Sequence, residues 1–247
     1  MKHLFLIGKN LNHSKSKSIH SFLLNELCLS DVVYENLEVS ETNLHSILSS
    51  LNSPDVLGAN ITIPYKEYAA NFFNNPNPIN TIYKTPNGIQ TTSTDFLGFI
   101  KTLSGIDLNK FDIFIFGSGG VSKSISSGFA SFGVQSKTVS RNGSINYDNF
   151  EQFKTKQCLL INATPLGTVG EFENATPTDK ISEGDVVYDL VYNPAVTNFM
   201  KLGMRKNCRV FNGMDMLIYQ AIFSMELFLN KQLNVDASFS VIKRNLK

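Results

Sequence analysis

Short apolar runs alternate with longer segments of helical periodicity along the first part of this chain. The apolar runs, which are candidate strands, occupy residues 3–8, 31–37, 56–63 and 80–92. The last of them contains Pro86-Asn87-Gly88, a turn signal that divides the run into a hairpin. Strands alternating with helices in this way predict an α/β fold with mainly parallel sheets.

A second series of apolar runs follows and predicts a second α/β unit. Its candidate strands occupy residues 111–120, 136–142, 158–165, 185–193 and 208–213. Helical patterns cover 121–133, directly after the first of these strands, and 214–230, where a single long helix fits. The boundary between the two units is expected within 96–110, where a helical pattern is followed by Gly105 and a polar connection.

Composition narrows the classes of protein that fit. The chain has 247 residues, enough for two domains with separate cores, and is 42% hydrophobic and 17% charged. Lys and Arg number 22 against 21 Asp and Glu, a balance that argues against a nucleic-acid partner. The apolar run near the start is too short for a signal peptide, and no stretch approaches a membrane span, so we expect a cytoplasmic protein. The 3 cysteines lack paired spacing, which suggests neither a disulfide framework nor a metal site.

The stretch "FDIFIFGSGGVSKS" is typical of a phosphate-binding turn between a strand and a helix. Gly117, Gly119 and Gly120 allow a tight turn that approaches a pyrophosphate, which the helix N-terminus then attracts. Position 122 is a serine, so the glycine fingerprint is incomplete and a plain strand-to-helix turn remains an alternative. After the next strand, Arg141 stands where an NAD enzyme would place Asp or Glu. This arginine indicates the 2′-phosphate of NADP, with a solvated surface arginine as the alternative.

The stretch "GANITIPYKEY" places a lysine where a helix disfavours a cation. Pro64 suits the first helical position, which puts Lys66 in the first turn. The unpaired N–H groups there make that end of the helix electropositive. Either Lys66 has a function that needs this field, or its ammonium group extends along its stem to solvent.

Other polar side chains follow candidate strands, where open α/β sheets bind ligands. Ser14 and Ser16 could hold a carboxylate or a polyol, although either serine could instead cap the following helix. Asn60 and Thr62 lie on a strand that should be buried, so their side chains need polar partners. Asp95 begins a helix and could serve only to stabilise its dipole.

Seven motifs in order give the chain a resemblance to a known family, the shikimate dehydrogenases. These motifs are "HSKSKSIH", "GANITIPYK", "NT" followed by "TSTDFLGF", "GSGG", "INATPLG", "YDLVYNPAVT" and "GMDMLIYQA". The resemblance covers nearly the whole chain and implies reversible reduction of 3-dehydroshikimate to shikimate by NADPH in aromatic amino-acid biosynthesis. It also implies a substrate-binding domain at 1–104, completed by 214–247, and a Rossmann-type NADP-binding domain at 105–213. The last helices are expected to return to the first domain.

The family's functional residues carry over onto matching positions of this sequence. Lys66 and Asp95 match the catalytic pair. The positions that hold the substrate are matched by Ser14, Ser16, Asn60, Thr62, Lys66, Asn80, Asp95, Tyr192 and Gln220. The positions near NADP are matched by Gly117, Gly119, Gly120, Arg141, Asn162, Thr164, Val191 and Gly213.

The resemblance implies a catalytic role for Lys66. A helix N-terminus destabilises the ammonium form, which favours proton exchange near neutral pH. We therefore expect Lys66 to pass a proton to or from the substrate hydroxyl while Asp95 orients it, as hydride moves between carbon and nicotinamide. The sequence leaves open whether Lys66 is the proton donor itself or an electrostatic anchor for the oxygen.

Departures from the family pattern occur at three positions, and two alternative functions remain. Lys17 replaces a usual proline, Ser93 a usual asparagine and Thr168 a usual methionine. A broader enzyme that also uses quinate shares most of these motifs, and a non-catalytic protein that senses NADP could share the fold. The expected partners are small molecules rather than nucleic acid or membrane, and a homodimer is left open.

Overall fold

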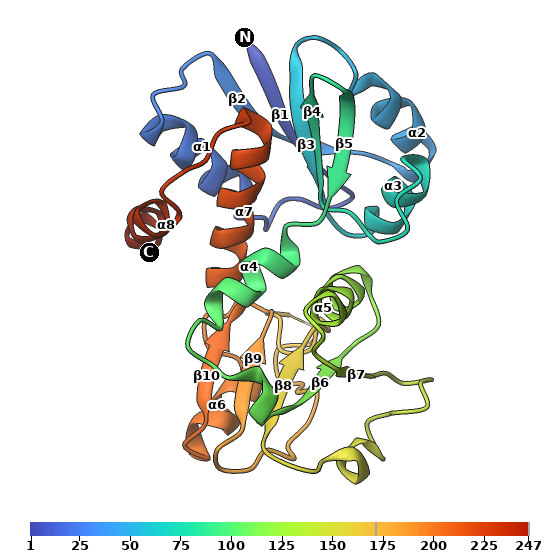
Figure 1. Cartoon of the computed structure of the whole chain (residues 1–247), viewed down its shortest axis with the longest axis vertical. Helices are drawn as coiled ribbons and strands as arrows, with labels where there is room; N and C mark the ends of the chain where they lie inside the picture. Colours follow the sequence, from blue (N-terminus) through green and yellow to red (C-terminus); the bar gives the residue numbers. More distant parts are fainter. Residues whose placement is uncertain (171, 247) are drawn as a thin grey trace. The chain divides into compact units, whose positions relative to one another are not determined.

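The computed structural model describes residues 1–170 and 172–246 (Figure 1). The chain divides into unit 1, Met1–Lys101 with Leu217–Lys247, and unit 2, Thr102–Met216. Each unit is built on one five-stranded sheet, so the predicted α/β class with two sheets is confirmed. The divisions fall within two helices, α4 (Asp95–Thr102) and α7 (Gly213–Leu229).

The sheet of unit 1 is mixed. Its spatial order is β2-β1-β3-β4-β5, with β1 parallel to both β2 and β3. The strands are β1 (Lys2–Gly8), β2 (Val32–Glu38), β3 (Val56–Ile61), β4 (Thr81–Thr85) and β5 (Gly88–Thr92). β4 is antiparallel to β3 and β5, which confirms the hairpin, and Gly88 adopts a φ of 102° at its turn.

Helices cover both faces of this sheet. The helices of unit 1 besides α4 and α7 are α1 (Ser16–Glu26), α2 (Glu41–Ser50), α3 (Lys66–Phe72) and α8 (Val235–Asn245). Helices α2 and α3 lie on one face, and α1 and α7 lie on the other (Figure 1). Alternate residues of β3 follow this division: Ala59 and Ile61 join the core under α2 and α3, whereas Asn60 contacts Ser224 on α7.

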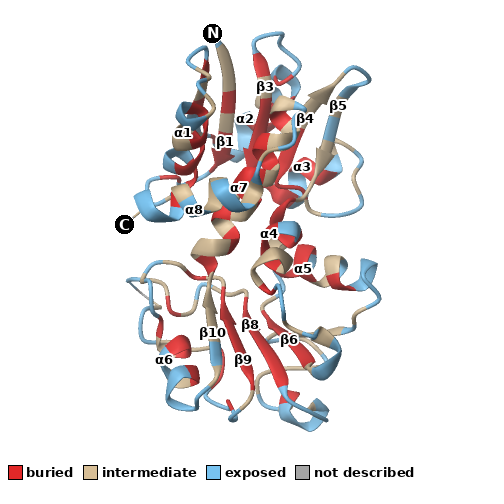
Figure 2. Cartoon of the chain, turned by 60° about the vertical axis from the view of Figure 1, so that its left-hand side comes forward, coloured by how far each residue is buried: buried red, intermediate tan, exposed pale blue. Residues whose placement is uncertain are grey.

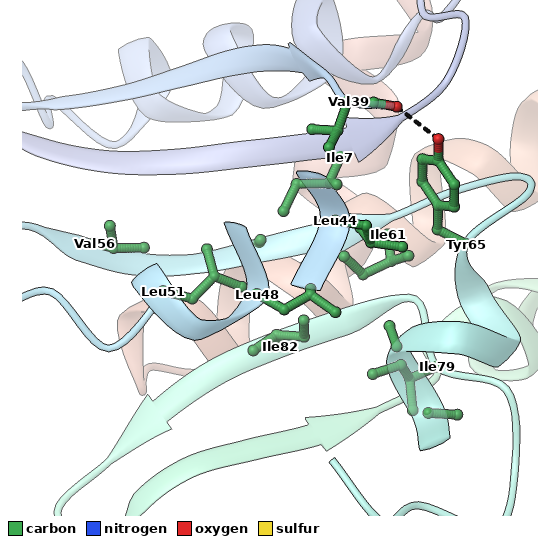
Figure 3. Close-up of a cluster of buried hydrophobic side chains, with 13 residues drawn as sticks. Ile7, Val39, Leu44, Leu48, Leu51, Val56, Ile61, Tyr65, Ile79 and Ile82 are labelled. Carbon is green, nitrogen blue, oxygen red and sulfur yellow. Dashed lines mark hydrogen bonds between the residues drawn. The ribbon is translucent and has the colours of Figure 1, made fainter. Parts of the chain in front are cut away.

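The core beneath α2 and α3 consists of aliphatic side chains from helix and sheet (Figure 3). Leu44 and Leu48 of α2 pack here, where β3 contributes Ile61. Each such side chain stabilises the fold by roughly 1.5–3 kcal/mol when fully buried. Tyr65 lies at the edge of this cluster and donates its hydroxyl to the carbonyl of Val39 at 2.6 Å, which fixes the segment just before α3.

The sheet of unit 2 is entirely parallel, with the order β10-β9-β8-β6-β7. Its strands are β6 (Asp112–Phe116), β7 (Ser136–Val139), β8 (Cys158–Asn162), β9 (Val186–Asp189) and β10 (Arg209–Asn212). The central strands are buried along their length (Figure 2), which explains their continuous apolar runs. The chain goes from β6 to β7 on one side and then to β8 on the other, so the carboxyl ends of β6 and β8 form a topological switch point, where such sheets bind ligands.

Helices α5 (Gly120–Ser131) and α6 (Asn198–Arg205) belong to unit 2, with 3₁₀ turns at Leu108–Lys110 and Phe150–Phe153. The predicted helix at 121–133 is confirmed as α5. Thr197 precedes α6, and its hydroxyl accepts the N–H of Met200 at 3.2 Å, a helix cap.

Two local predictions differ from the structure. Pro64 was expected to open a helix, but α3 begins at Lys66, because Tyr65 N donates to Thr62 O at 2.9 Å and closes a turn that leaves Pro64 outside the helix. The predicted single helix at 214–230 is confirmed as α7, but the sequence pattern did not predict α8. Helix α8 starts after Asn234, whose side chain accepts the N–H of Ala237, and Asp236 in its first turn pairs with Lys101 at 2.9 Å.

Candidate active site

The polar side chains of unit 1 gather at one edge of its sheet. Strands β1, β3 and β5 run in the same direction, since β4 is antiparallel to both of its neighbours. Their carboxyl ends, together with the start of β4, therefore lie at the same edge. The segments that leave this edge carry the predicted residues Ser14, Ser16, Thr62, Lys66, Asn80 and Asp95.

Lys66 and Asp95 meet at this edge. Helix α3 begins at Lys66 and helix α4 begins at Asp95. Lys66 Nζ lies 2.6 Å from Asp95 Oδ2, and the two residues are 7% and 5% exposed. Desolvating two opposite charges is costly, so a buried pair of this kind is weak evidence of a stabilising role and stronger evidence of a functional one.

The position of Lys66 in the first turn of α3 agrees with the sequence prediction. Its ammonium group faces the electropositive end of its own helix, and the Asp95 carboxylate offsets that field. Asp95 itself occupies the start of α4, where a negative charge is favoured. A side chain that can carry a proton and a carboxylate that accepts a hydrogen bond from it are therefore held together away from water. The alternative in which Lys66 extends to solvent is wrong, because Lys66 is buried.

Asn80 and Gln220 extend the site on either side of Asp95. Asn80 Nδ2 donates to Asp95 Oδ1 at 2.9 Å, so both oxygens of this carboxylate have partners. The same Nδ2 lies 3.1 Å from Gln220 Oε1 on α7. Gln220 is 7% exposed, and its own amide nitrogen donates to the carbonyl of Leu217. Residues from β4, α4 and α7 thus converge on one carboxylate.

Asn60 lies on β3, and buried polar side chains hold its amide group by hydrogen bonds. Its Oδ1 accepts the hydroxyl of Tyr34 at 2.9 Å, and its Nδ2 donates to Ser224 Oγ at 3.0 Å. Nδ2 also lies within hydrogen-bond distance of Thr81 Oγ1. The expectation that a polar residue in this buried strand needs partners is confirmed.

The two serines lie where α1 begins. Ser16 is the first residue of α1 and is buried, while Ser14 is half-buried two residues earlier. Ser14 Oγ accepts the N–H of Ser16 at 3.2 Å, so this hydroxyl satisfies one unpaired helix donor. Thr62 follows β3 and is half-buried against Gly8, whose added Cβ would lie 2.7 Å from Thr62 Cγ2.

Three polar residues of this site carried no assignment from the sequence. Thr81, Thr94 and Ser224 are fully buried and hydrogen-bond to one another and to the amides described above. A signal existed for Ser224, which stands between the apolar residues Phe223 and Met225 in α7. A buried hydroxyl needs a partner, but the sequence does not say which one.

In unit 2, the glycine turn lies at the switch point of the sheet. Gly117 follows β6 with a φ of 113°, and a Cβ there would lie 2.8 Å from the carbonyl oxygen of Ala163. Gly119 precedes α5, and a Cβ there would meet open space. Ser122, which interrupts the glycine fingerprint, donates its hydroxyl to Gly117 O at 2.6 Å and fastens the turn to α5. The turn leaves the N-terminus of α5 open at the edge where ligands bind.

Arg141 lies just past β7, the neighbour of β6 in the sheet. It is exposed, and within the described residues its side chain makes no hydrogen bond or ion pair. An exposed guanidinium of this kind is open to a phosphate, to which it can donate two hydrogen bonds.

A second polar cluster follows β8 and β9. Asn162 ends β8, and its Oδ1 accepts the hydroxyl of Thr164 at 2.6 Å. Its Nδ2 donates to Asp189 Oδ1 at 2.9 Å, and Asp189 ends β9. The N–H of Val191 donates to the same Asp189 oxygen at 3.0 Å, while Thr197 donates to Oδ2 at 2.5 Å. Burial raises the pKa of Asp189 to about 6, even though these hydrogen bonds favour the carboxylate form.

The last two predicted residues of unit 2 lie close to this cluster in the sequence. Gly213 begins α7, and a Cβ there would collide with the backbone carbonyl of Leu190, so this position requires glycine. Tyr192 is half-buried in the segment after β9. Asp189 was missed by the sequence analysis, although an aspartate ending an apolar strand was a signal. No helix in the described parts of the chain is long and apolar enough to cross a membrane.

Comparisons with known proteins agree with this architecture. A family model described as the shikimate dehydrogenase substrate binding domain matches residues 6–89. Shikimate dehydrogenase (NADP(+)) of Caldicellulosiruptor bescii is 33% identical over 255 residues, which cover 90% of this chain and 87% of that protein. The protein of the same name from Clostridium beijerinckii is 31% identical and covers 98% of both chains.

Solved structures give the same result for the fold. Shikimate 5-dehydrogenase of Thermus thermophilus, in complex with NADP(H) and shikimate, is 25% identical, with a TM-score of 0.83 over 99% of both chains. Since a relative more than 30% identical spans most of both chains, the resemblance first indicated by seven short motifs is confirmed, and this chain belongs to the shikimate dehydrogenase family.

Proposed function

We propose that this chain is an NADP-dependent dehydrogenase that reversibly reduces 3-dehydroshikimate to shikimate, a step of aromatic amino-acid biosynthesis. Family membership supports the reaction, and the buried Lys66–Asp95 pair is the observation in this chain that carries it. A protein that only sensed NADP would gain nothing from burying a lysine and a carboxylate 2.6 Å apart. The pair therefore favours catalysis over binding alone.

Lys66 and Asp95 are proposed as the catalytic residues. In the direction of reduction, the ammonium group of Lys66 gives a proton to the oxygen and becomes a neutral amine, and in the direction of oxidation the neutral amine takes up the proton that leaves the reacting hydroxyl group. Asp95 holds Nζ through the 2.6 Å contact and keeps it at the position where charge develops on oxygen. When NADP is bound, its nicotinamide accepts or supplies the hydride.

The substrate is a carboxylate that carries several hydroxyl groups, and the predicted contact residues suit it. Hydroxyl and amide side chains both donate and accept hydrogen bonds, as such a ligand requires. We propose that they are Ser14, Ser16, Asn60, Thr62, Lys66, Asn80, Asp95, Tyr192 and Gln220. The start of α1 next to Ser14 and Ser16 is suited to a carboxylate, because the unpaired N–H groups of a helix attract anions.

The geometry of unit 2 fits the phosphates of NADP. Open space at Gly119 leaves room for a pyrophosphate beside the N-terminus of α5, and Gly117 allows the turn to pass close to the backbone of Ala163. The exposed guanidinium of Arg141 suits the 2′-phosphate. We propose that the cofactor contacts are Gly117, Gly119, Gly120, Arg141, Asn162, Thr164, Val191 and Gly213.

The proposed contact residues suggest a role for each predicted domain. We propose that 1–104 with 214–247 binds the substrate and that 105–213 binds NADP. We also propose that the enzyme works in the cytoplasm on small molecules, as fits a biosynthetic reaction. A homodimer remains a prediction.

The appearance of the reduced-cofactor absorbance band on mixing the protein with shikimate and NADP⁺ tests the reaction. We expect steady turnover with the wild-type protein, and its loss in Lys66→Met. Turnover of quinate at a rate similar to that of shikimate would identify the broader enzyme instead. A folded protein that binds NADP but oxidises neither compound would overturn the proposal in favour of a sensing role.

A further inference from the structure

Three buried hydroxyl groups from three separate segments meet behind Asp95. Thr81 lies on β4, Thr94 directly precedes α4 and Ser224 lies on α7, and each is 0% exposed. Ser224 Oγ lies 2.9 Å from Thr94 Oγ1 and 3.0 Å from Thr81 Oγ1. Hydroxyl groups in such a dry place must satisfy one another or a neighbouring polar group.

The neighbouring group is the amide of Asn80, and its orientation is fixed from two sides. The N–H of Thr94 donates to one amide atom at 2.8 Å, and a backbone N–H can only donate, so that atom is Oδ1. Asp95 Oδ1 lies 2.9 Å from the other atom, and an ionised carboxylate can only accept, so that atom is Nδ2. The hydrogen-bond pattern alone therefore assigns the two atoms of the Asn80 amide.

With this orientation, one assignment of the hydroxyl protons links the three hydroxyl groups and the amide into a closed ring of hydrogen bonds, and Thr94 Oγ1 also lies 3.2 Å from Asn80 Oδ1. Asn80 Nδ2 donates to Thr94 Oγ1 at 3.1 Å, and Thr94 then donates to Ser224 Oγ at 2.9 Å. Ser224 donates to Thr81 Oγ1 at 3.0 Å, and Thr81 returns its proton to Asn80 Oδ1 at 2.7 Å. Each hydroxyl in the ring donates once and accepts once. A ring of this kind is cooperative, so the loss of one member weakens the rest.

We propose that Thr81, Thr94 and Ser224 are positioning residues that act on the reaction through Asn80. This inference rests on the proposed function of the Lys66–Asp95 pair. The ring holds the amide of Asn80 with its nitrogen toward Asp95, and the bond from Nδ2 then holds Asp95 Oδ1. The other carboxylate oxygen, Oδ2, is left facing Lys66 Nζ at 2.6 Å.

Ser224 also joins the ring to Asn60. Asn60 Nδ2 donates to Ser224 Oγ, and Asn60 Oδ1 accepts from Tyr34, so the same ring fixes a second predicted substrate residue. The ring therefore couples the geometry of the proton-transfer pair to that of the substrate amides. Loss of a hydroxyl should slow the chemical step more than it weakens the binding of NADP, whose predicted contacts lie in unit 2.

Thr81 allows a matched test, because one substitution removes its hydroxyl and another removes its methyl group. Thr81→Val keeps the side-chain shape and deletes the ring bond, whereas Thr81→Ser keeps the bond. We expect kcat for shikimate oxidation to fall about three- to tenfold in Thr81→Val, which corresponds to the net contribution of one hydrogen bond, with KM for NADP⁺ unchanged. Thr81→Ser should retain most of the wild-type kcat. A role in packing alone predicts the reverse order, since the serine variant leaves the larger void.

Ser224→Ala supplies a second test if Thr81→Val does not fold. Ser46→Ala is its control. Ser46, like Ser224, lies on a helix of unit 1, but it is exposed, and its hydroxyl donates to the backbone carbonyl of Asn43 instead of joining the ring. We expect Ser224→Ala to lower kcat about three- to tenfold and to shift its pH profile, while the control changes neither. Equal kcat values and pH profiles for Ser224→Ala and wild type, or equal kcat for Thr81→Val and Thr81→Ser, would overturn the positioning role. A wild-type protein without turnover would instead refute the proposed function.

Discussion

Each unit buries a carboxylate near the carboxyl ends of its strands, but the two carboxylates have different neighbours. Asp95 in unit 1 faces the ammonium group of Lys66 at 2.6 Å. Asp189 in unit 2 accepts hydrogen bonds from an amide, a backbone N–H and a hydroxyl, and it forms no ion pair in the described parts of the chain. Asp95 therefore belongs to a pair that can exchange a proton, whereas Asp189 ties together the segments that follow β8 and β9.

The difference shows how the neighbours of a buried carboxyl group decide what it can do. A cation beside a carboxylate keeps it charged and holds a transferable proton next to it. Neutral donors offset only part of the cost of burial, and the pKa of Asp189 rises to about 6 as a result. Function in unit 1 should therefore respond to loss of charge, and stability in unit 2 should respond to pH.

The largest effect is expected from Lys66→Met, which removes the charge and keeps most of the aliphatic stem. If Lys66 moves a proton or stabilises the developing charge on oxygen, the variant should lose about 10² to 10⁴ in kcat, with a smaller change in KM for shikimate. Steady-state kinetics on the folded variant measures this. A near-normal kcat in Lys66→Met would show that the charge of Lys66 has no role in the reaction, so the contrast between Asp95 and Asp189 would no longer be one of function.

A second prediction concerns His20 in unit 1, which is a buried base rather than a buried acid. Its ring stacks on Tyr34 at 4.1 Å, and neither ring nitrogen has a hydrogen-bond partner within residues 1–170 and 172–246. Burial lowers the pKa of His20 from 6.5 to about 3. The folded protein thus binds fewer protons than the unfolded chain between these values, and stability is lost as the pH falls below 6.5.

His20→Phe keeps a stacking ring and removes the titration. Relative to this variant, the wild-type protein should lose roughly 2 to 3 kcal/mol of unfolding free energy between about pH 7.5 and about pH 4.5. Urea unfolding of both proteins across this range gives the difference, in which other titrating groups cancel. A difference that does not vary with pH would show that burial does not lower the pKa of His20.

The third prediction tests the cofactor preference of unit 2. Arg141→Ala should weaken the specificity constant for NADP⁺ by about tenfold to a hundredfold, because a charge-assisted contact to a phosphate contributes roughly 1.5–3 kcal/mol. The constant for NAD⁺ should change much less, since its ribose hydroxyl offers no comparable partner. An unchanged ratio of the two constants would refute the assignment of Arg141 to the 2′-phosphate.

The smallest effect is expected at Asp189. Its folded-state pKa of about 6 lies above the ordinary value of 3.8, so the folded protein binds more protons than the unfolded chain between these values. The wild-type protein should therefore gain about 2 kcal/mol relative to Asp189→Asn as the pH falls from about 7.5 to about 4.5. The sign is opposite to that at His20. The same unfolding series checks it, and a fall in relative stability on acidification would contradict the comparison of the two carboxylates.

Local patterns predicted much of the fold because the relevant forces are local. The hairpin signal at Pro86-Asn87-Gly88, the apolar strands of unit 2 and the glycine turn after β6 all appear in the structure. The start of α3 was misplaced, because the turn closed by Tyr65 and Thr62 competes with the preference of Pro64 for a helix start. Helix α8 has a polar, mostly exposed sequence, and its contact through Asp236 with Lys101 cannot be read from periodicity.

The site was predictable only in part, for a related reason. Lys66 and Asp95 stood out because each begins a helix beside a strand, and motif order linked them to a family. The hydroxyl ring joins Thr81 and Thr94 to Ser224, which lies far away along the chain, and such partners are set by tertiary packing. The stacking of His20 on Tyr34 is hidden in the same way.

A double-mutant cycle on Lys66 and Asp95 tests the central claim most directly. The kcat values of Lys66→Met, Asp95→Asn and the double variant would be compared with wild type under the same saturating conditions. If the two residues act as one unit, the loss in the double variant should be much smaller than the product of the two single losses. Losses that multiply would mean that Lys66 and Asp95 act independently, and would contradict the account of the site as a coupled pair.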